Sequence, residues 1–229
     1  ADATDGRVVG RVEAGSGGLV KAMSPVLREH GGCWVGWPGT VDVGREELER
    51  LLAKVARQAG FDYVPVPLSE EERDDYYHGF ANEVLWPLLH DLQTHFRFAP
   101  RYWDAYRSVN RRFARVLAET AREGDFVWAH DYHLIGTAVA LRRLGYEGPV
   151  GHFLHTPFPP EDILVKLPWR AEILEGLLHF DLLGFQTLRD RRNFVGCLRR
   201  FAPEVRLEGE GRVVEGRWEG RPFRVGVFP

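Results

Sequence analysis

Between residues 126 and 201, short apolar runs alternate with longer segments of helical periodicity. The runs are four or five residues long, and the segments between them repeat apolar residues three and four positions apart. Strands that are separated by helices lie parallel, because the helix returns the chain to the same end of the sheet. The expected strands are 126–129, 150–154 and 182–185, and the expected helices are 134–144, 168–178 and 190–201. The sequence therefore predicts an α/β fold, a parallel sheet with helices on both faces.

The segments outside this region are less regular. A helical stripe runs over residues 46–59, and short strands are expected at 33–37 and 63–66. Ser69 predicts a helix start, and the segment that follows is rich in aromatic residues. Glycine-rich turns in residues 205–229 indicate a hairpin before a final strand.

The composition excludes several classes of protein. The chain has 229 residues and a formal net charge of -3, and its basic residues are dispersed among acidic ones, so neither nucleic acid nor a membrane surface is expected as a partner. Cys33 and Cys197 are too far apart in sequence for a metal-binding pair, which favours a reduced, cytoplasmic setting. No apolar stretch reaches the roughly 20 residues that a membrane span needs. The arginines of the last expected helix are interpreted as a solvated face; they are Arg189, Arg191, Arg192, Arg199 and Arg200.

Polar clusters follow two of the expected strands. His130 and Asp131 come directly after one, and His155 comes directly after the next. Because ligands of open α/β sheets bind outside the carboxyl ends of the strands, we expect Asp131 and His155 to line a ligand crevice. The alternative is that both histidines lie in the core and bond backbone carbonyls. A zinc site through His130 and His133 has no third ligand nearby in its favour, so neither a metal nor a cofactor is expected.

Glycines and aromatic residues give weaker indications of a site. Gly17 and Gly18 precede a helical segment, where a phosphate could approach the backbone, although a flexible entry loop explains them equally well. Flat aromatic faces stack on sugar rings, which makes Tyr76, Tyr77 and Trp86 candidates, whereas Phe80 and Trp34 are expected in the core. Trp37 stands before a Pro-Gly turn at the end of a short strand. No pattern typical of a serine hydrolase, zinc protease or P-loop is visible.

Seven blocks, in order, resemble the trehalose-phosphate synthases, a family of retaining glycosyltransferases. They are 16–19, 34–37, 77–87, 109–110, 128–134, 153–159 and 181–187. The resemblance implies two Rossmann-like domains that face each other across a cleft, of which residues 1–229 correspond to the first, acceptor-side domain. It implies transfer of glucose from a nucleoside-diphosphate glucose to glucose 6-phosphate, with retention and without a covalent intermediate. The leaving diphosphate is thought to help take the acceptor proton.

The resemblance also assigns roles to the candidate residues. Asp131 and Tyr77 bind the acceptor, and Trp37 and Trp86 shape the acceptor pocket. His155 lies beside the donor sugar at the reacting centre. Gly17 and Gly18 approach the donor's phosphate and sugar.

Two parts of the family pattern have no counterpart in this sequence. One is the opening strand that ends in Asn-Arg-Leu-Pro, and the other is the second domain, so the chain alone is expected to be inactive. A sister enzyme that glucosylates glycerol phosphate remains an alternative, and so does a non-catalytic regulatory or sugar-binding relative. The sequence leaves open whether copies of the chain assemble into a homo-oligomer.

Overall fold

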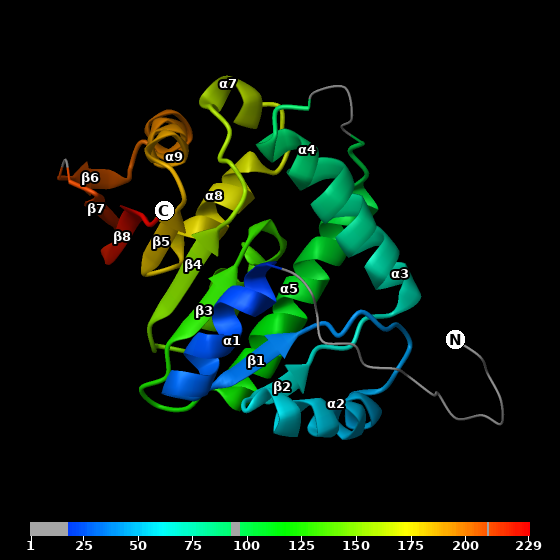
Figure 1. Ribbon diagram of the computed structural model, residues 1–229. Helices are drawn as coiled ribbons and strands as arrows, with labels where there is room; N and C mark the ends of the chain where they lie inside the picture. Colours follow the sequence, from blue (N-terminus) through cyan, green and yellow to red (C-terminus); the bar gives the residue numbers. More distant parts are fainter. Residues whose placement is uncertain (1–17, 93–96, 210) are drawn as a thin grey trace. The chain divides into compact units, whose positions relative to one another are not determined.

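The computed structural model describes residues 18–92, 97–209 and 211–229 (Figure 1). The chain divides into two compact units, 1–70 and 71–229. Among the described residues, no helix combines the length and the apolar character that crossing a bilayer would require.

The first unit pairs two helices with two short strands. Helix α1 (Gly18–His30) leads to β1 (Cys33–Gly36), and α2 (Arg45–Ala59) leads to β2 (Asp62–Pro65), which lies parallel to β1. Glu46 and Glu47 in the first turn of α2 suit the positive end of its dipole. Gly60 ends the helix with a φ of 79°, a left-handed conformation that glycine adopts without steric cost.

The second unit is built on a six-stranded sheet in the order β3-β4-β5-β8-β7-β6. The first four strands are parallel, and β7 and β6 continue the sheet in antiparallel pairing. The strands are β3 (Val127–His130), β4 (Val150–Leu154), β5 (Leu182–Phe185), β6 (Arg206–Glu208), β7 (Val213–Trp218) and β8 (Arg221–Val227). The predicted α/β fold with a parallel sheet and helices is confirmed, and the tail forms the predicted hairpin.

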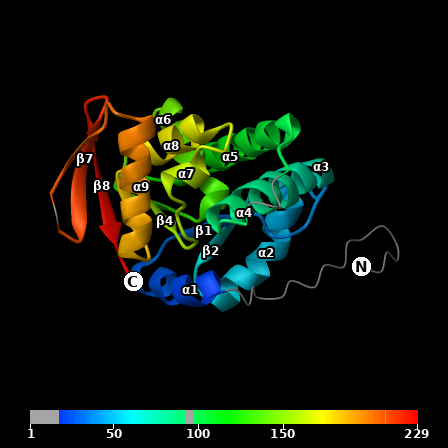
Figure 2. The same ribbon diagram turned by 90° about the horizontal axis from the view of Figure 1, so that it is seen from above.

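Helices connect the parallel strands. Between β3 and β4 lie η3 (Tyr132–Leu134) and α6 (Thr137–Arg143), and between β4 and β5 lie α7 (Glu161–Leu164) and α8 (Arg170–Leu178). Helix α9 (Leu188–Phe201) follows β5 and lies beside β8 (Figure 2). These connections bring the carboxyl ends of β3 and β4 to one edge of the sheet.

Two further helical segments precede the sheet. After α3 (Glu70–Glu72), η1 (Arg73–Leu85) is π-helical, and α4 (Trp86–Leu89) continues it. Its buried residues fall into groups at 76, 79–81 and 84–85, whose spacing fits the wider turn. Helix α5 (Pro100–Thr120) packs on η1 and on α6. The ring of Phe80 is 4.6 Å from that of Tyr106, which places Phe80 in the core as predicted.

Candidate active site

Asp131 directly follows β3 in a backbone conformation that few residues adopt. Its φ of 64° and ψ of 175° lie in a region populated almost exclusively by glycine. Its N–H still donates to the carbonyl of Phe153, at 2.8 Å, so the β3–β4 pairing continues through the strained residue. Strain of this kind costs about 1–3 kcal/mol and persists where the surrounding structure enforces it.

Hydrogen bonds from η1 and α5 hold the segment that follows Asp131. The Tyr106 hydroxyl donates to the carbonyl of Tyr132 at 2.7 Å and accepts from the N–H of Ile135 at 3.2 Å. The carbonyl of His133 accepts from the Tyr76 hydroxyl and from the side-chain amide of Asn110. Because these donors are buried or nearly so, the segment has little freedom to move.

The side chain of His152 forms a hydrogen bond with the backbone of Asp131. Its side chain is 2% exposed, and burial lowers its pKa to about 3 although a hydrogen bond to Asp131 opposes that shift. The bond joins His152 Nε2 to the Asp131 carbonyl oxygen at 3.1 Å. Since a carbonyl only accepts, neutral His152 carries its proton on Nε2. His152 is thus a core histidine that bonds a backbone carbonyl, which is the arrangement that the sequence left open for His130 and His155.

His130 and His155 meet at the edge of the sheet where β3 and β4 end. Their Nδ1 and Nε2 atoms are 3.1 Å apart, and their rings stack with centroids 5.4 Å apart. Burial, followed by the charge of His155, lowers the pKa of His130 to about 4. Burial also lowers the pKa of His155, against the opposing charge of Asp131. Both imidazoles are therefore neutral near pH 7, and one donates a hydrogen bond to the other.

Asp131 and His155 lie on the same edge of the sheet. Thr156, which follows His155, has its hydroxyl 3.4 Å from a carboxylate oxygen of Asp131. Both candidate residues are partly exposed, so a ligand can reach them. The structure thus brings these two predicted residues together.

Helix α9 holds the loop that carries His155. The N–H of Phe158 donates to the Asp190 carboxylate at 3.1 Å, and the Asn193 amide donates to the Phe158 carbonyl at 2.8 Å. Asp190 is itself positioned by the N-cap residue Thr187, which accepts from its backbone N–H. The loop is therefore anchored to the helix by a carboxylate and an amide.

Tyr77 lies beside His133 next to Asp131. The two rings stack with centroids 5.4 Å apart and an interplanar angle of 18°. Burial lowers the pKa of His133 to about 4, against the opposing charge of Asp131. Its buried Nε2 has no hydrogen-bond partner within the part of the chain that the structure describes. An atom so shielded from solvent cannot be contacted by a ligand in this conformation, so what His133 contributes here is the ring face on which Tyr77 stacks.

The structure does not test the roles of the other four predicted residues. Trp86 starts α4, is 40% exposed, and its ring lies tilted against that of His90, with centroids 4.3 Å apart. Trp37 and Gly18 belong to the first unit, where the Trp37 indole donates to the Thr40 carbonyl and Gly18 is the first residue of α1. Gly17 lies outside the described residues. The roles of these four residues stay predictions.

Sequence reasoning missed the supporting residues Tyr106, Asn110 and His152. Asn110 stood in a block that carried the family resemblance, but nothing in its neighbourhood indicated a hydrogen bond to the segment after β3. In the described residues, no group of three histidine, cysteine or acidic side chains is arranged to hold a metal ion. The zinc alternative through His130 and His133 therefore lacks a third ligand there.

Comparisons with known proteins agree on one family. The model of glycosyltransferase family 20 matches residues 2–229. The trehalose-6-phosphate synthase of Mycolicibacterium vanbaalenii is 41% identical over 217 residues, which cover 93% of this chain and 44% of that protein. The chain thus spans less than half the length of this relative.

Solved structures show the same likeness. An α,α-trehalose-phosphate synthase (UDP-forming) from Burkholderia xenovorans, in complex with glucose-6-phosphate, superposes with a TM-score of 0.80 at 32% identity and covers 94% of this chain and 46% of its own. A structure from E. coli bound with UDP-2-fluoro glucose gives a TM-score of 0.79 at 33% identity, over 96% of this chain and 47% of its own.

Proposed function

The chain belongs to glycosyltransferase family 20, and we propose that it is the acceptor-side half of an enzyme that transfers glucose from UDP-glucose to glucose 6-phosphate, giving trehalose 6-phosphate. The observation that carries the proposal is the convergence of Asp131 and His155 on one edge of the sheet, bridged through Thr156. The names of the relatives supply the substrates: one structure holds glucose-6-phosphate and is called UDP-forming, and another holds UDP-2-fluoro glucose.

In this proposal Asp131 orients the acceptor. Its carboxylate accepts hydrogen bonds from sugar hydroxyls and fixes which hydroxyl faces the anomeric carbon of the donor. Holding two reactants in line removes several kcal/mol from the barrier of a bimolecular step. Tyr77, stacked on His133, offers an aromatic face and a hydroxyl to the same sugar.

His155 acts on the donor side. Its Nε2 is engaged by His130, so Nδ1 is the ring nitrogen left to bond a hydroxyl of the donor glucose. The bond from the anomeric carbon to the diphosphate breaks, and the bond to the acceptor oxygen forms on the same face. The departing diphosphate takes the acceptor proton, so no catalytic carboxylate base is required. Donors that stabilise the diphosphate charge would come from the second domain of the family.

The test is an assay of the full-length protein with UDP-glucose and either glucose 6-phosphate or glycerol phosphate. We expect trehalose 6-phosphate from the first pair and a loss of at least a hundredfold in kcat/KM for Asp131→Ala. Preference for glycerol phosphate would favour the sister enzyme, and no transfer with any acceptor would favour a regulatory relative. Equal rates for wild type and Asp131→Ala would remove Asp131 from the mechanism. We also expect residues 1–229 alone not to transfer glucose.

A further inference from the structure

Two faces of helix α9 contact other parts of the second unit. One face holds the loop of the candidate site through Asp190 and Asn193. The other faces the antiparallel strands β6 and β7 and borders a cavity of about 250 Å³. No residue that lines this cavity belongs to the candidate active site.

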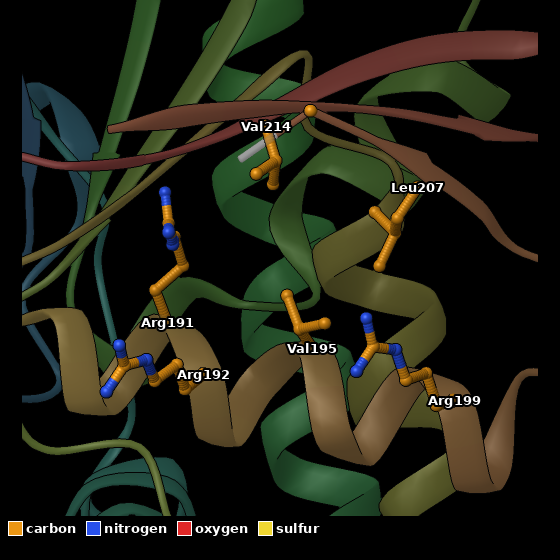
Figure 3. A pocket seen from close by; sticks show the side chains of 7 residues that line it. Arg191, Arg192, Val195, Arg199, Leu207 and Val214 are labelled. Carbon is orange, nitrogen blue, oxygen red and sulfur yellow. The ribbon is translucent and has the colours of Figure 1, made fainter. Parts of the chain in front are cut away.

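The cavity combines positive charge with apolar walls. Figure 3 shows the side chains of Arg191 and Arg199 extending from α9 toward the strands, with Val195 between them. The helix contributes Arg191, Arg192, Val195 and Arg199, and the strands contribute Leu207 and Val214. Guanidinium groups therefore lie on one side and aliphatic groups line the rest.

The nearest acidic residues of the two strands point away from the cavity. Side chains alternate between the faces of a strand, and Leu207 and Val214 lie on the cavity side. Glu208 and Glu215, which are paired across the strands and are both exposed, lie on the opposite side. Within the described residues, no carboxylate forms an ion pair with the three arginines of the cavity.

Arg191 differs from the solvated arginine that the sequence predicted. Its side chain is buried, with 8% exposure, so the interpretation of this helix face as solvated is wrong at this position. Its Nη1 donates to the carbonyl of Gly211 at 2.6 Å, which fixes the guanidinium at the cavity. A buried charge is costly unless an opposite charge accompanies it, and a backbone carbonyl supplies only a partial one. The remaining N–H groups are thus suited to an anion from outside the chain.

We propose that this cavity binds the phosphate group of a small phosphorylated molecule. A phosphate has three terminal oxygens, and guanidinium groups bond such oxygens in pairs. The volume lies just below the range of about 300–1,000 Å³ that is typical of ligand sites, so the ligand is small. Val195, Leu207 and Val214 would contact an apolar part of the same molecule. This site is separate from the one in the proposed function and does not depend on it.

The test follows the backbone amides of Val195, Leu207 and Val214 by NMR in the full-length protein, during titration with inorganic phosphate and, separately, with phenyl phosphate. Because these three residues line the cavity, shifts of their amides report on binding there even if phosphate also binds elsewhere on the protein. We expect saturable shifts with both probes at constant ionic strength, and tighter binding of phenyl phosphate because it also contacts the apolar wall. Absence of saturable shifts at these amides with either probe would overturn the proposal.

Two double variants distinguish a defined phosphate site from a general attraction of phosphate by the net charge of the protein. Arg192→Glu with Arg199→Glu should weaken binding at these amides at least tenfold, since each removes charge-assisted hydrogen bonds. Arg206→Glu with Arg217→Glu reverses the same number of charges on the opposite face of the strands and should bind as wild type does. All four arginines are exposed, so neither pair threatens the fold. Equal weakening by both pairs would show that net charge alone attracts phosphate and would reject the site.

Discussion

Nδ1 of His130 lies 3.1 Å from Nε2 of His155, and this contact couples the protonation of the two rings. Because burial keeps both imidazoles neutral near pH 7, one ring donates its proton and the other accepts it. The tautomer of His155 therefore depends on which ring donates, and so does the hydrogen-bonding character of the free Nδ1. We therefore expect His130 to act as a positioning residue for His155.

Replacing His130 should test this coupling. For His130→Ala in the full-length enzyme, we expect kcat to fall about ten- to a hundredfold, because His155 loses its orientation, while KM for the acceptor changes little. Nitrogen NMR of the His155 ring should change from one tautomer to a mixture. His179→Gln is the matched control, since that histidine precedes β5 at the other end of the strands. A fall in activity without any change at the His155 ring would contradict a positioning role.

Asp131→Gly should stabilise the protein while abolishing activity. Glycine relieves the strain at a φ of 64° and ψ of 175°, a gain of about 1–3 kcal/mol, offset by about 0.5–1 kcal/mol of backbone entropy. We expect the free energy of unfolding to rise by about 1 kcal/mol in chemical denaturation. Asp131→Asn should lose activity without this gain, since it keeps the strained backbone. If both variants were equally stable, the strain argument would fail.

The pH dependence of stability should report on His152. Its pKa is about 3 in the folded protein and about 6.5 in an unfolded chain, so below pH 6.5 the unfolded state binds the extra proton. The stability that neutral His152 contributes is present above pH 6.5 and is lost by about 1.4 kcal/mol per pH unit as the pH falls toward 3.

A His152→Leu variant lacks this titration. At pH 7 it should be less stable than wild type by about 1–3 kcal/mol, because the Asp131 carbonyl loses its hydrogen bond. At pH 4.5 the difference should disappear, since wild type has by then lost a similar amount. Urea denaturation of both proteins at the two pH values measures this, and parallel pH dependence would refute it.

The parallel core of the fold was predictable because its strands are short, apolar and bounded by turns. The expected strands 150–154 and 182–185 have the same bounds as β4 and β5. By contrast, α7 was not predicted, because four residues are too few to show a period. The π-helical turn of η1 was also missed, since periodicity was judged against 3.6 residues per turn.

The position of Asp131 and His155 at one edge of the sheet was predictable, but the residues that support them were not. Each of the two follows an apolar run, and the parallel pairing of β3 and β4 brings the positions after these runs to the same edge. The strained backbone of Asp131 was not predictable, because only a glycine there would have indicated it. Likewise, the burial of Arg191 depends on a part of the chain that follows it by some 20 residues, so the periodicity of the helix alone could not predict it.

Two helical glycines should respond oppositely to alanine, although alanine favours a helix by about 1 kcal/mol at either. At Gly176 in α8 a Cβ would lie 2.9 Å from the carbonyl oxygen of Ile135, and the Ile135 N–H is held by Tyr106. At Gly196 in α9 a Cβ would meet nothing within 4 Å. We therefore expect Gly176→Ala to destabilise by about 1–3 kcal/mol and Gly196→Ala to stabilise by about 0.5–1 kcal/mol in chemical denaturation. Because Ile135 ends the segment that begins at Asp131, Gly176→Ala should also lower kcat/KM, whereas Gly196→Ala should not. If the two substitutions changed the free energy of unfolding in the same direction, the packing described for α8 would be contradicted.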